Sequence, residues 1–84
     1  MVKRTLLKRC AEQIASEMER QSYEHWAEQS LPISFEYTFE DQTLQVEIDV
    51  LELEPNYIHL VVSVDDGGLS ALLPACTSII INKE

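Results

Sequence analysis

The chain has 84 residues, of which 45% are hydrophobic, and a formal net charge of −9 at pH 7. This length suits one domain with one core, so residues 1–84 are expected to form a single small domain. The apolar fraction excludes wholesale disorder, and no apolar run approaches the roughly 20 residues that a membrane-spanning helix needs. The basic N-terminus lacks a continuous apolar stretch, so we expect no signal peptide and a cytoplasmic protein.

The charges are unevenly distributed along the chain. Residues 1–20 contain five Lys or Arg side chains and three Glu, whereas residues 21–82 contain eleven Asp or Glu and no Lys or Arg. Such an acidic surface repels nucleic acids and anionic membranes, so neither is expected as a partner. The basic residues near the N-terminus are too few to reverse this balance. They are expected to face the acidic sheet of the same chain or of a second copy. These residues are Lys3, Arg4, Lys8 and Arg9.

Residues 2–29 are predicted to be helical, because they lack Pro and Gly and carry apolar residues at spacings of three and four. Pro32 disfavours helix at the residue before it, so the helix should end near Ser30. It would then span about 40 Å, against about 25 Å for a strand of seven or eight residues. Either the helix breaks near Gln21–Ser22, or its overhang packs on a second copy in a homodimer. The apolar stripe is Leu7, Cys10, Ala11, Ile14 and Met18.

The segment "ISFEYTF" (Ile33–Phe39) alternates apolar and polar residues and predicts the first strand. If Asp41–Gln42 is a two-residue loop, the apolar residues of this strand meet apolar residues of the next, as in Phe39 opposite Leu44. The same register places Glu36 opposite Glu47. Facing like charges cost a few tenths to about 1 kcal/mol, so these carboxylates are not expected to stabilise the sheet.

The alternation slips by one residue at Val50–Leu51, which predicts a β-bulge with Leu51 and Leu53 continuing the apolar face. Pro55–Asn56 is a turn into the next strand, Tyr57–Val64, and this register places Glu52 opposite His59. The inward residues of that strand are expected to be Ile58, Leu60, Val62 and Val64.

The remaining segments complete a predicted α+β fold. Asp65–Gly68 reads as a turn, Leu69–Pro74 fits either a short strand or one helical turn, and Ser78–Ile81 predicts a final strand at the sheet edge. The expected architecture is one N-terminal helix packed across an antiparallel β-meander of about four strands.

The main candidate site is a set of carboxylates that the alternation places on the polar face of the sheet. We call this set the acidic row: Glu36, Glu47, Asp49 and Glu52, with His59 beside it. Ordinary protein surfaces mix both charge signs, so a row without Lys or Arg fits docking of a basic partner as well as it fits a merely solvated surface.

The other candidate residues have weaker support. Tyr23 and Trp26 would become interface anchors if the helix projects, although core packing is the simpler role for Trp26. Cys76, His59 and the Asp65–Gly68 segment could serve a small-molecule-binding protein or a minor enzyme subunit if they converged on one pocket. Cys10 and Cys76 are expected to be reduced thiols.

Known catalytic motifs and calcium-loop patterns are absent from the sequence, so no enzymatic activity, cofactor or metal is expected. The sequence therefore predicts a non-enzymatic interaction or regulatory module that presents an acidic sheet face to a protein partner with a basic surface. One alternative is the small-molecule binder or enzyme subunit, and another is an acidic mimic of nucleic acid.

Overall fold

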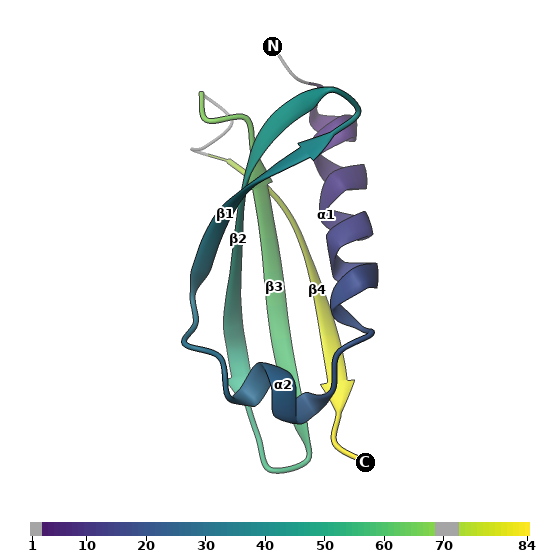
Figure 1. The fold of residues 1–84 in the computed structure, drawn as a ribbon, viewed down its shortest axis with the longest axis vertical. Coiled ribbons are helices and arrows are strands. Elements are labelled where there is room, and N and C mark those ends of the chain that lie inside the picture. Colours follow the sequence, from purple (N-terminus) through teal and green to yellow (C-terminus); the bar gives the residue numbers. More distant parts are fainter. Residues whose placement is uncertain (1–2, 69–72) are drawn as a thin grey trace.

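The computed structural model describes residues 3–68 and 73–84, and it has the predicted α+β architecture (Figure 1). Within these residues, two helices precede a four-stranded antiparallel sheet with the strand order β1-β2-β3-β4. The question of whether Leu69–Pro74 is strand or helix falls mostly on residues 69–72, which lie outside the described residues. The elements are α1 (Arg4–Met18), α2 (Tyr23–Ala27), β1 (Ile33–Phe39), β2 (Gln42–Leu53), β3 (Tyr57–Asp65) and β4 (Ala75–Asn82).

The helical region is broken rather than continuous, so the prediction of one helix reaching Ser30 is wrong and the alternative of a break near Gln21–Ser22 is confirmed. Ser22 has extended backbone angles, and its hydroxyl accepts a hydrogen bond from the His25 amide at 3.1 Å. Serine is among the preferred N-cap residues because its side chain satisfies an otherwise free amide. The overhang on which the homodimer interpretation depended is therefore absent. No helix among the described residues is long and apolar enough to span a membrane.

The β1–β2 hairpin differs from the predicted register by two residues. Glu40 and Asp41 both have positive φ, at 49° and 64°, as the two-residue type I′ turn requires, and Phe39 pairs with Gln42. A shift of two residues keeps every side chain on its predicted face. It changes the neighbours across the hairpin, so that Glu36 faces Gln45 and the predicted Glu36–Glu47 pair is wrong.

The predicted bulge in β2 is confirmed by a register shift between Val50 and Glu52, and Glu52 pairs with His59 as expected. Leu51 and Leu53 do not continue the buried face, because their side chains are 55% and 54% exposed. They lie beyond Ile48, where the pairing of β2 with β1 ends. β4 begins at Ala75, three residues before the predicted strand, and it forms an edge of the sheet.

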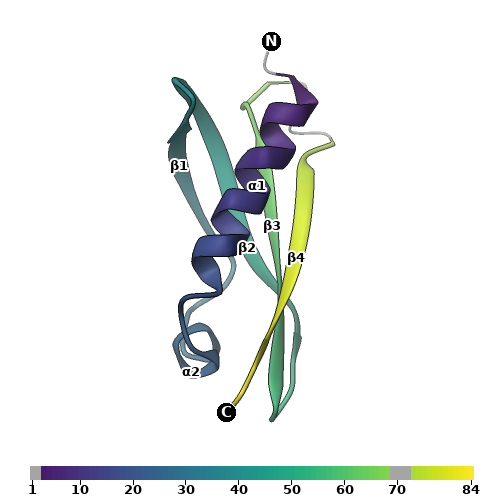
Figure 2. The ribbon, with the colours of Figure 1, turned by 90° about the vertical axis from the view of Figure 1, so that its right-hand side faces the viewer.

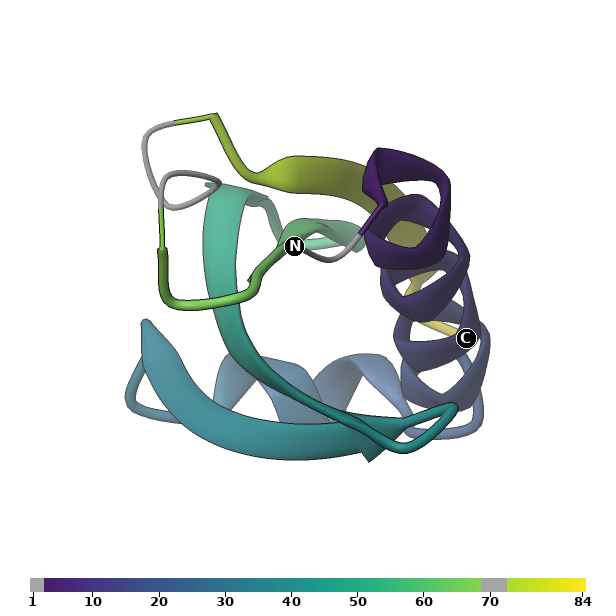
Figure 3. The same cartoon turned by 90° about the horizontal axis from the view of Figure 1, so that it is seen from above.

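The core lies between α1 and the inner side of the sheet. α1 packs on β3 and β4 (Figure 2), and the sheet is strongly curled, with α1 on its inner side (Figure 3). Every predicted residue of the helical stripe and every predicted inward residue of β3 is buried. The inward residues of β1 are covered less completely, since Ile33, Tyr37 and Phe39 are half-buried and Phe35 is 37% exposed.

Candidate protein-docking face

The side of the sheet turned away from the core is not covered by α1 or α2 (Figure 3). We call it the outer face. Strand pairing aligns its side chains in rows: Glu52 beside His59 and Ile80, Asp49 beside Val61 and Ser78, Glu47 between Ser34 and Ser63, and Glu36 beside Gln45 and Asp65. The whole acidic row therefore shares one face, as the alternation predicted.

The outer face has two halves of different chemistry. Carboxylates occupy the half formed by β1 and β2. The half formed by β4 carries Cys76, Ser78 and Ile80, and Ile80 is 56% exposed. The acidic surface is therefore a band along one side of the sheet rather than a uniform coating.

Three members of the acidic row face only neutral residues on the adjacent strands. Glu36 accepts a hydrogen bond from the Gln45 side chain, at 3.4 Å between Nε2 and Oε2. Glu47 is exposed and flanked by two serines on the neighbouring strands. Asp49 is half-buried at the bulge, where its Oδ1 accepts a hydrogen bond from the Val50 amide at 2.7 Å, so it also has a structural role.

Glu52 lies in a polar cluster at the other end of the row. Its Oε1 is 3.8 Å from Nδ1 of His59, and its carboxylate also hydrogen-bonds the Tyr57 side chain. Desolvation, followed by the charge and hydrogen bond of Glu52, raises the pKa of Tyr57 above its ordinary value.

The basic residues near the N-terminus do not reach the acidic row within the described part of the chain. Arg4 donates hydrogen bonds to the Leu73 and Pro74 carbonyls, and Lys8 donates to the Cys76 carbonyl at 2.6 Å between Nζ and O. Arg9 forms an ion pair with Glu40 at the hairpin turn, at 2.5 Å between Nη1 and Oε2. Of these three residues, Arg9 pairs with a carboxylate of the β1–β2 hairpin, and none pairs with the acidic row.

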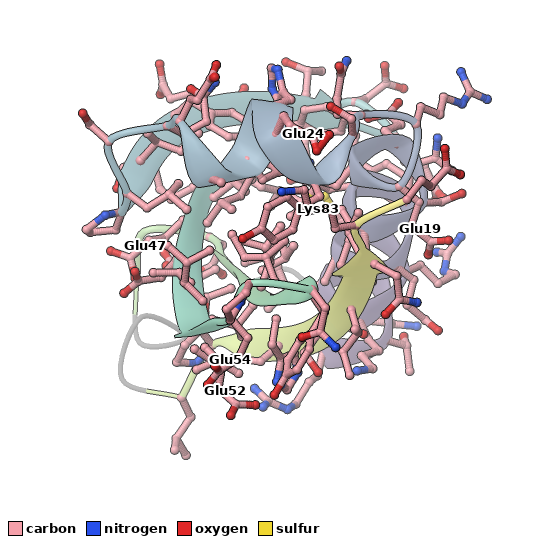
Figure 4. The ribbon with its side chains drawn as sticks, turned by 90° about the horizontal axis from the view of Figure 1, so that it is seen from below. Glu19, Glu24, Glu47, Glu52, Glu54 and Lys83 are labelled. Carbon is pink, nitrogen blue, oxygen red and sulfur yellow. The ribbon has the colours of Figure 1, made fainter. Side chains whose placement is uncertain are left out.

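Lys83 is also directed away from the acidic row. Its ammonium group lies 5.6 Å from the centre of the Tyr23 ring, on the α2 side of the molecule. Seen from below, Glu47 and Glu52 project from the far side of β2, away from Lys83 (Figure 4). The carboxylates of the acidic row therefore have no Lys or Arg partner among the described residues.

The two aromatic candidates pack within the chain. Trp26 is buried, and its indole donates a hydrogen bond to the Met18 carbonyl at 3.1 Å. Tyr23 is half-buried, and its hydroxyl donates to the Glu54 carbonyl at 2.6 Å. Because no helix projects from the domain, the condition under which they would be interface anchors is not fulfilled. Trp26 has the core role that was its simpler interpretation.

Cys76, His59 and the Asp65–Gly68 segment are not gathered into one pocket. His59 and Asp65 are six positions apart on β3, which separates them by about 20 Å. Asp65 accepts a hydrogen bond from the Gly67 amide at 2.7 Å, and the positive φ of Gly67, 83°, fits a turn. No group of three metal-ligating side chains that could hold an ion occurs in the described residues.

Sequence reasoning missed Asp65 as a member of the outer face. It pairs with Gln45 and helps to line a shallow depression of about 330 Å³ together with Glu47 and Ser63. Its position in the alternation after the inward-facing Val64 could have revealed this orientation. We interpreted it only as a turn residue because two glycines follow.

Comparison with known proteins yields no match for this chain, either to a protein-family model or to a characterised protein or solved structure. The chemistry of the outer face is therefore the basis for any functional proposal.

Proposed function

We propose that this chain is a non-enzymatic interaction module that docks a protein with a basic surface on its outer face. The observation that carries the proposal is that four carboxylates share one uncovered side of the sheet, where no Lys or Arg is present in any strand. Complementary charge on a partner would speed association and fix its orientation.

Repulsion among the carboxylates of the acidic row is too weak to distinguish this face from an ordinary surface. Since Glu36 faces Gln45, no two members of the acidic row are directly opposed across β1 and β2. Glu47 and Asp49 follow each other on one face of β2 at about 7 Å, where two charges in water repel by about 0.6 kcal/mol. The fold tolerates this cost easily. The distinguishing feature is the lack of counter-charge, which leaves a negative field directed at solvent.

Binding of an unstructured basic peptide to charge-reversed variants tests the proposal. A Lys/Ser repeat peptide is the probe, and Glu36→Lys combined with Glu47→Lys is the variant, because both side chains are exposed and neither bonds the backbone. Asp49 is left intact because it accepts the Val50 amide. We expect the double variant to bind the peptide about tenfold more weakly by calorimetry, a loss of about 1.4 kcal/mol that two ion pairs of up to about 1 kcal/mol each can supply.

The matched control reverses two exposed carboxylates outside the sheet, Glu12→Lys with Glu19→Lys, which changes the net charge by the same amount. The proposal requires that this control lose clearly less affinity than the outer-face variant. Equal losses would mean that the peptide responds only to net charge, and the docking role of the outer face would be refuted.

A further inference from the structure

The open edge of β1 adjoins an apolar groove on the inner side of the sheet. The groove has a volume of about 270 Å³, close to the lower limit of ligand pockets, and lies between the helices and the first two strands. It exists because α1 packs on β3 and β4 and leaves the inner side of β1 partly uncovered. Six of its nine lining residues are apolar, and the other three are polar: Ile14, Met18, Trp26, Ile33, Phe35 and Ile48, with Glu17, Gln21 and His25.

The β1 backbone can accept another strand. In a two-residue hairpin the closing pair, here Phe39 with Gln42, exchanges hydrogen bonds, and bonded and non-bonded pairs then alternate along the ladder. The N–H and C=O groups of Ser34, Glu36 and Thr38 therefore point to the open edge. All three residues are exposed, and in the described chain no backbone hydrogen bond from outside the sheet reaches them.

An added strand would meet two different environments on its two sides. Side chains next to Ile33 and Phe35 would enter the apolar groove, because facing residues in a sheet share a side. Side chains next to Glu36 would lie on the outer face one strand from its carboxylate, and those next to Ser34 would lie two strands from Glu47. That second distance, about 10 Å, is comparable with the Debye length at physiological salt.

From this arrangement we infer that β1 binds an extended segment of a partner protein in which apolar residues alternate with Lys or Arg. The apolar residues fill the groove, the basic residues pair with the acidic row, and the backbone extends the sheet by one strand. The inference that the segment is basic rests on the proposed function. The inferences that it pairs with β1 and fills the groove do not rest on it. A second copy of this chain is a poor occupant, because antiparallel pairing of two β1 strands around their centres brings Glu36 of both copies together.

The test uses three synthetic peptides of about nine residues, a typical upper length for a strand. The first alternates Lys and Val, the second has the same composition in two blocks, and the third alternates Glu and Val. We expect the first to bind at micromolar affinity, since the added interface is small, and the others at least about tenfold more weakly. Hydrogen exchange should show new protection of the Ser34, Glu36 and Thr38 amides upon binding of the first peptide.

N-methylation of the Lys–Val peptide tests the backbone pairing on the unmodified protein. A strand presents alternate amides to each of its edges, so methylating one alternate set should abolish binding, while methylating the other set should leave it. Loss with both sets, or with neither, would overturn the inference. The inference would also be overturned if, without peptide, hydrogen-exchange protection of the β1 amides increased with protein concentration. That result would show that a second copy of the chain occupies the edge.

A matched pair of variants tests the groove. Phe35→Ala should weaken binding of the Lys–Val peptide by about tenfold, through loss of apolar contact, whereas Ile80→Ala on the far half of the outer face should leave it unchanged. Equal effects would contradict binding at the groove. If the block peptide binds as well as the alternating one, strand addition is wrong and the acidic docking face stands. If the Glu–Val peptide binds as well, strand addition stands and the proposed function fails.

Discussion

β1 and β3 have the same alternation of apolar and polar residues, but they are buried to different extents. In β3 every inward side chain is less than 2% exposed, because α1 covers this part of the sheet and β2 and β4 flank it. β1 has a neighbour on one edge only, and its Phe35 is 37% exposed. A strand pattern therefore specifies which side faces the core, but the placement of the helix decides how well that side is covered.

Because of this difference, one half of the sheet mainly stabilises the fold, and the other half presents the surface proposed for binding. The covered half, β3 and β4 under α1, supplies most of the core. The open half, β1 and β2, combines the acidic row with an apolar groove and a free edge. Interaction surfaces typically include such partly exposed apolar residues, because a residue that is fully buried in the core has no accessible surface for contact with a partner.

Truncation of a large side chain in each half should produce the largest difference in the free energy of unfolding between the two halves. Leu60→Ala, in the covered half, should lower the free energy of unfolding by about 2–5 kcal/mol, because it leaves a cavity at a fully buried position. Phe35→Ala should cost less than about 2 kcal/mol, because part of that ring is already in water. Urea unfolding measures both, with an unchanged m-value as the check that unfolding stays two-state. Equal costs would show that β1 belongs to the same core as β3.

The residues of the covered half could be predicted from the sequence because they depend on local periodicity. The stripe from Leu7 to Met18 repeats every three or four residues, and the inward residues of β3 alternate without interruption. The acidic row was predictable in the same way, since a register error of two residues does not move a side chain to the other face.

The open half was less predictable because it depends on features without a local pattern. Glu40 and Asp41 occupy a turn with positive φ, a backbone region that is uncommon for residues other than glycine, asparagine and aspartate, so the loop position was misplaced. The bonds of Arg4 and Lys8 to carbonyls about 70 residues away depend on the tertiary fold. The incomplete cover over β1 follows from where α1 lies on the sheet, which the sequence does not encode locally.

Removal of the Ser22 N-cap measures how much this cap of α2 contributes to the free energy of unfolding. Ser22→Ala should lower the free energy of unfolding by about 1 kcal/mol, because the His25 amide loses its partner, while Ser22→Asn should preserve the cap. Trp26 fluorescence should shift to longer wavelength in the alanine variant if α2 frays, since that ring is now only 6% exposed. An asparagine variant as unstable as the alanine variant would show that the side-chain cap is not what fixes α2.

The two cysteines provide the subtlest contrast, between the inner and the outer side of the covered half, and it is visible only in alkaline solution. Cys10 is a fully buried residue of α1, and desolvation, assisted by the charge of Glu17, raises the pKa of its thiol from 9.0 to about 11. Above pH 9.0 the thiol ionises in the unfolded chain but stays protonated in the fold. This group's contribution to stability is therefore complete below pH 9.0 and is lost progressively as the pH rises towards about 11.

Comparison of two alanine variants isolates this contribution from the tyrosines, whose raised pKa values, caused first by desolvation, add a common background. Urea unfolding across this pH range should show a shallower loss of stability in Cys10→Ala than in the unmodified protein. Cys76→Ala, which removes an exposed thiol from the outer face, should retain the steeper loss. If the two variants lose stability in parallel, the thiol of Cys10 ionises as readily in the fold as in the unfolded chain. α1 would then not exclude water from this half of the core as its complete burial requires.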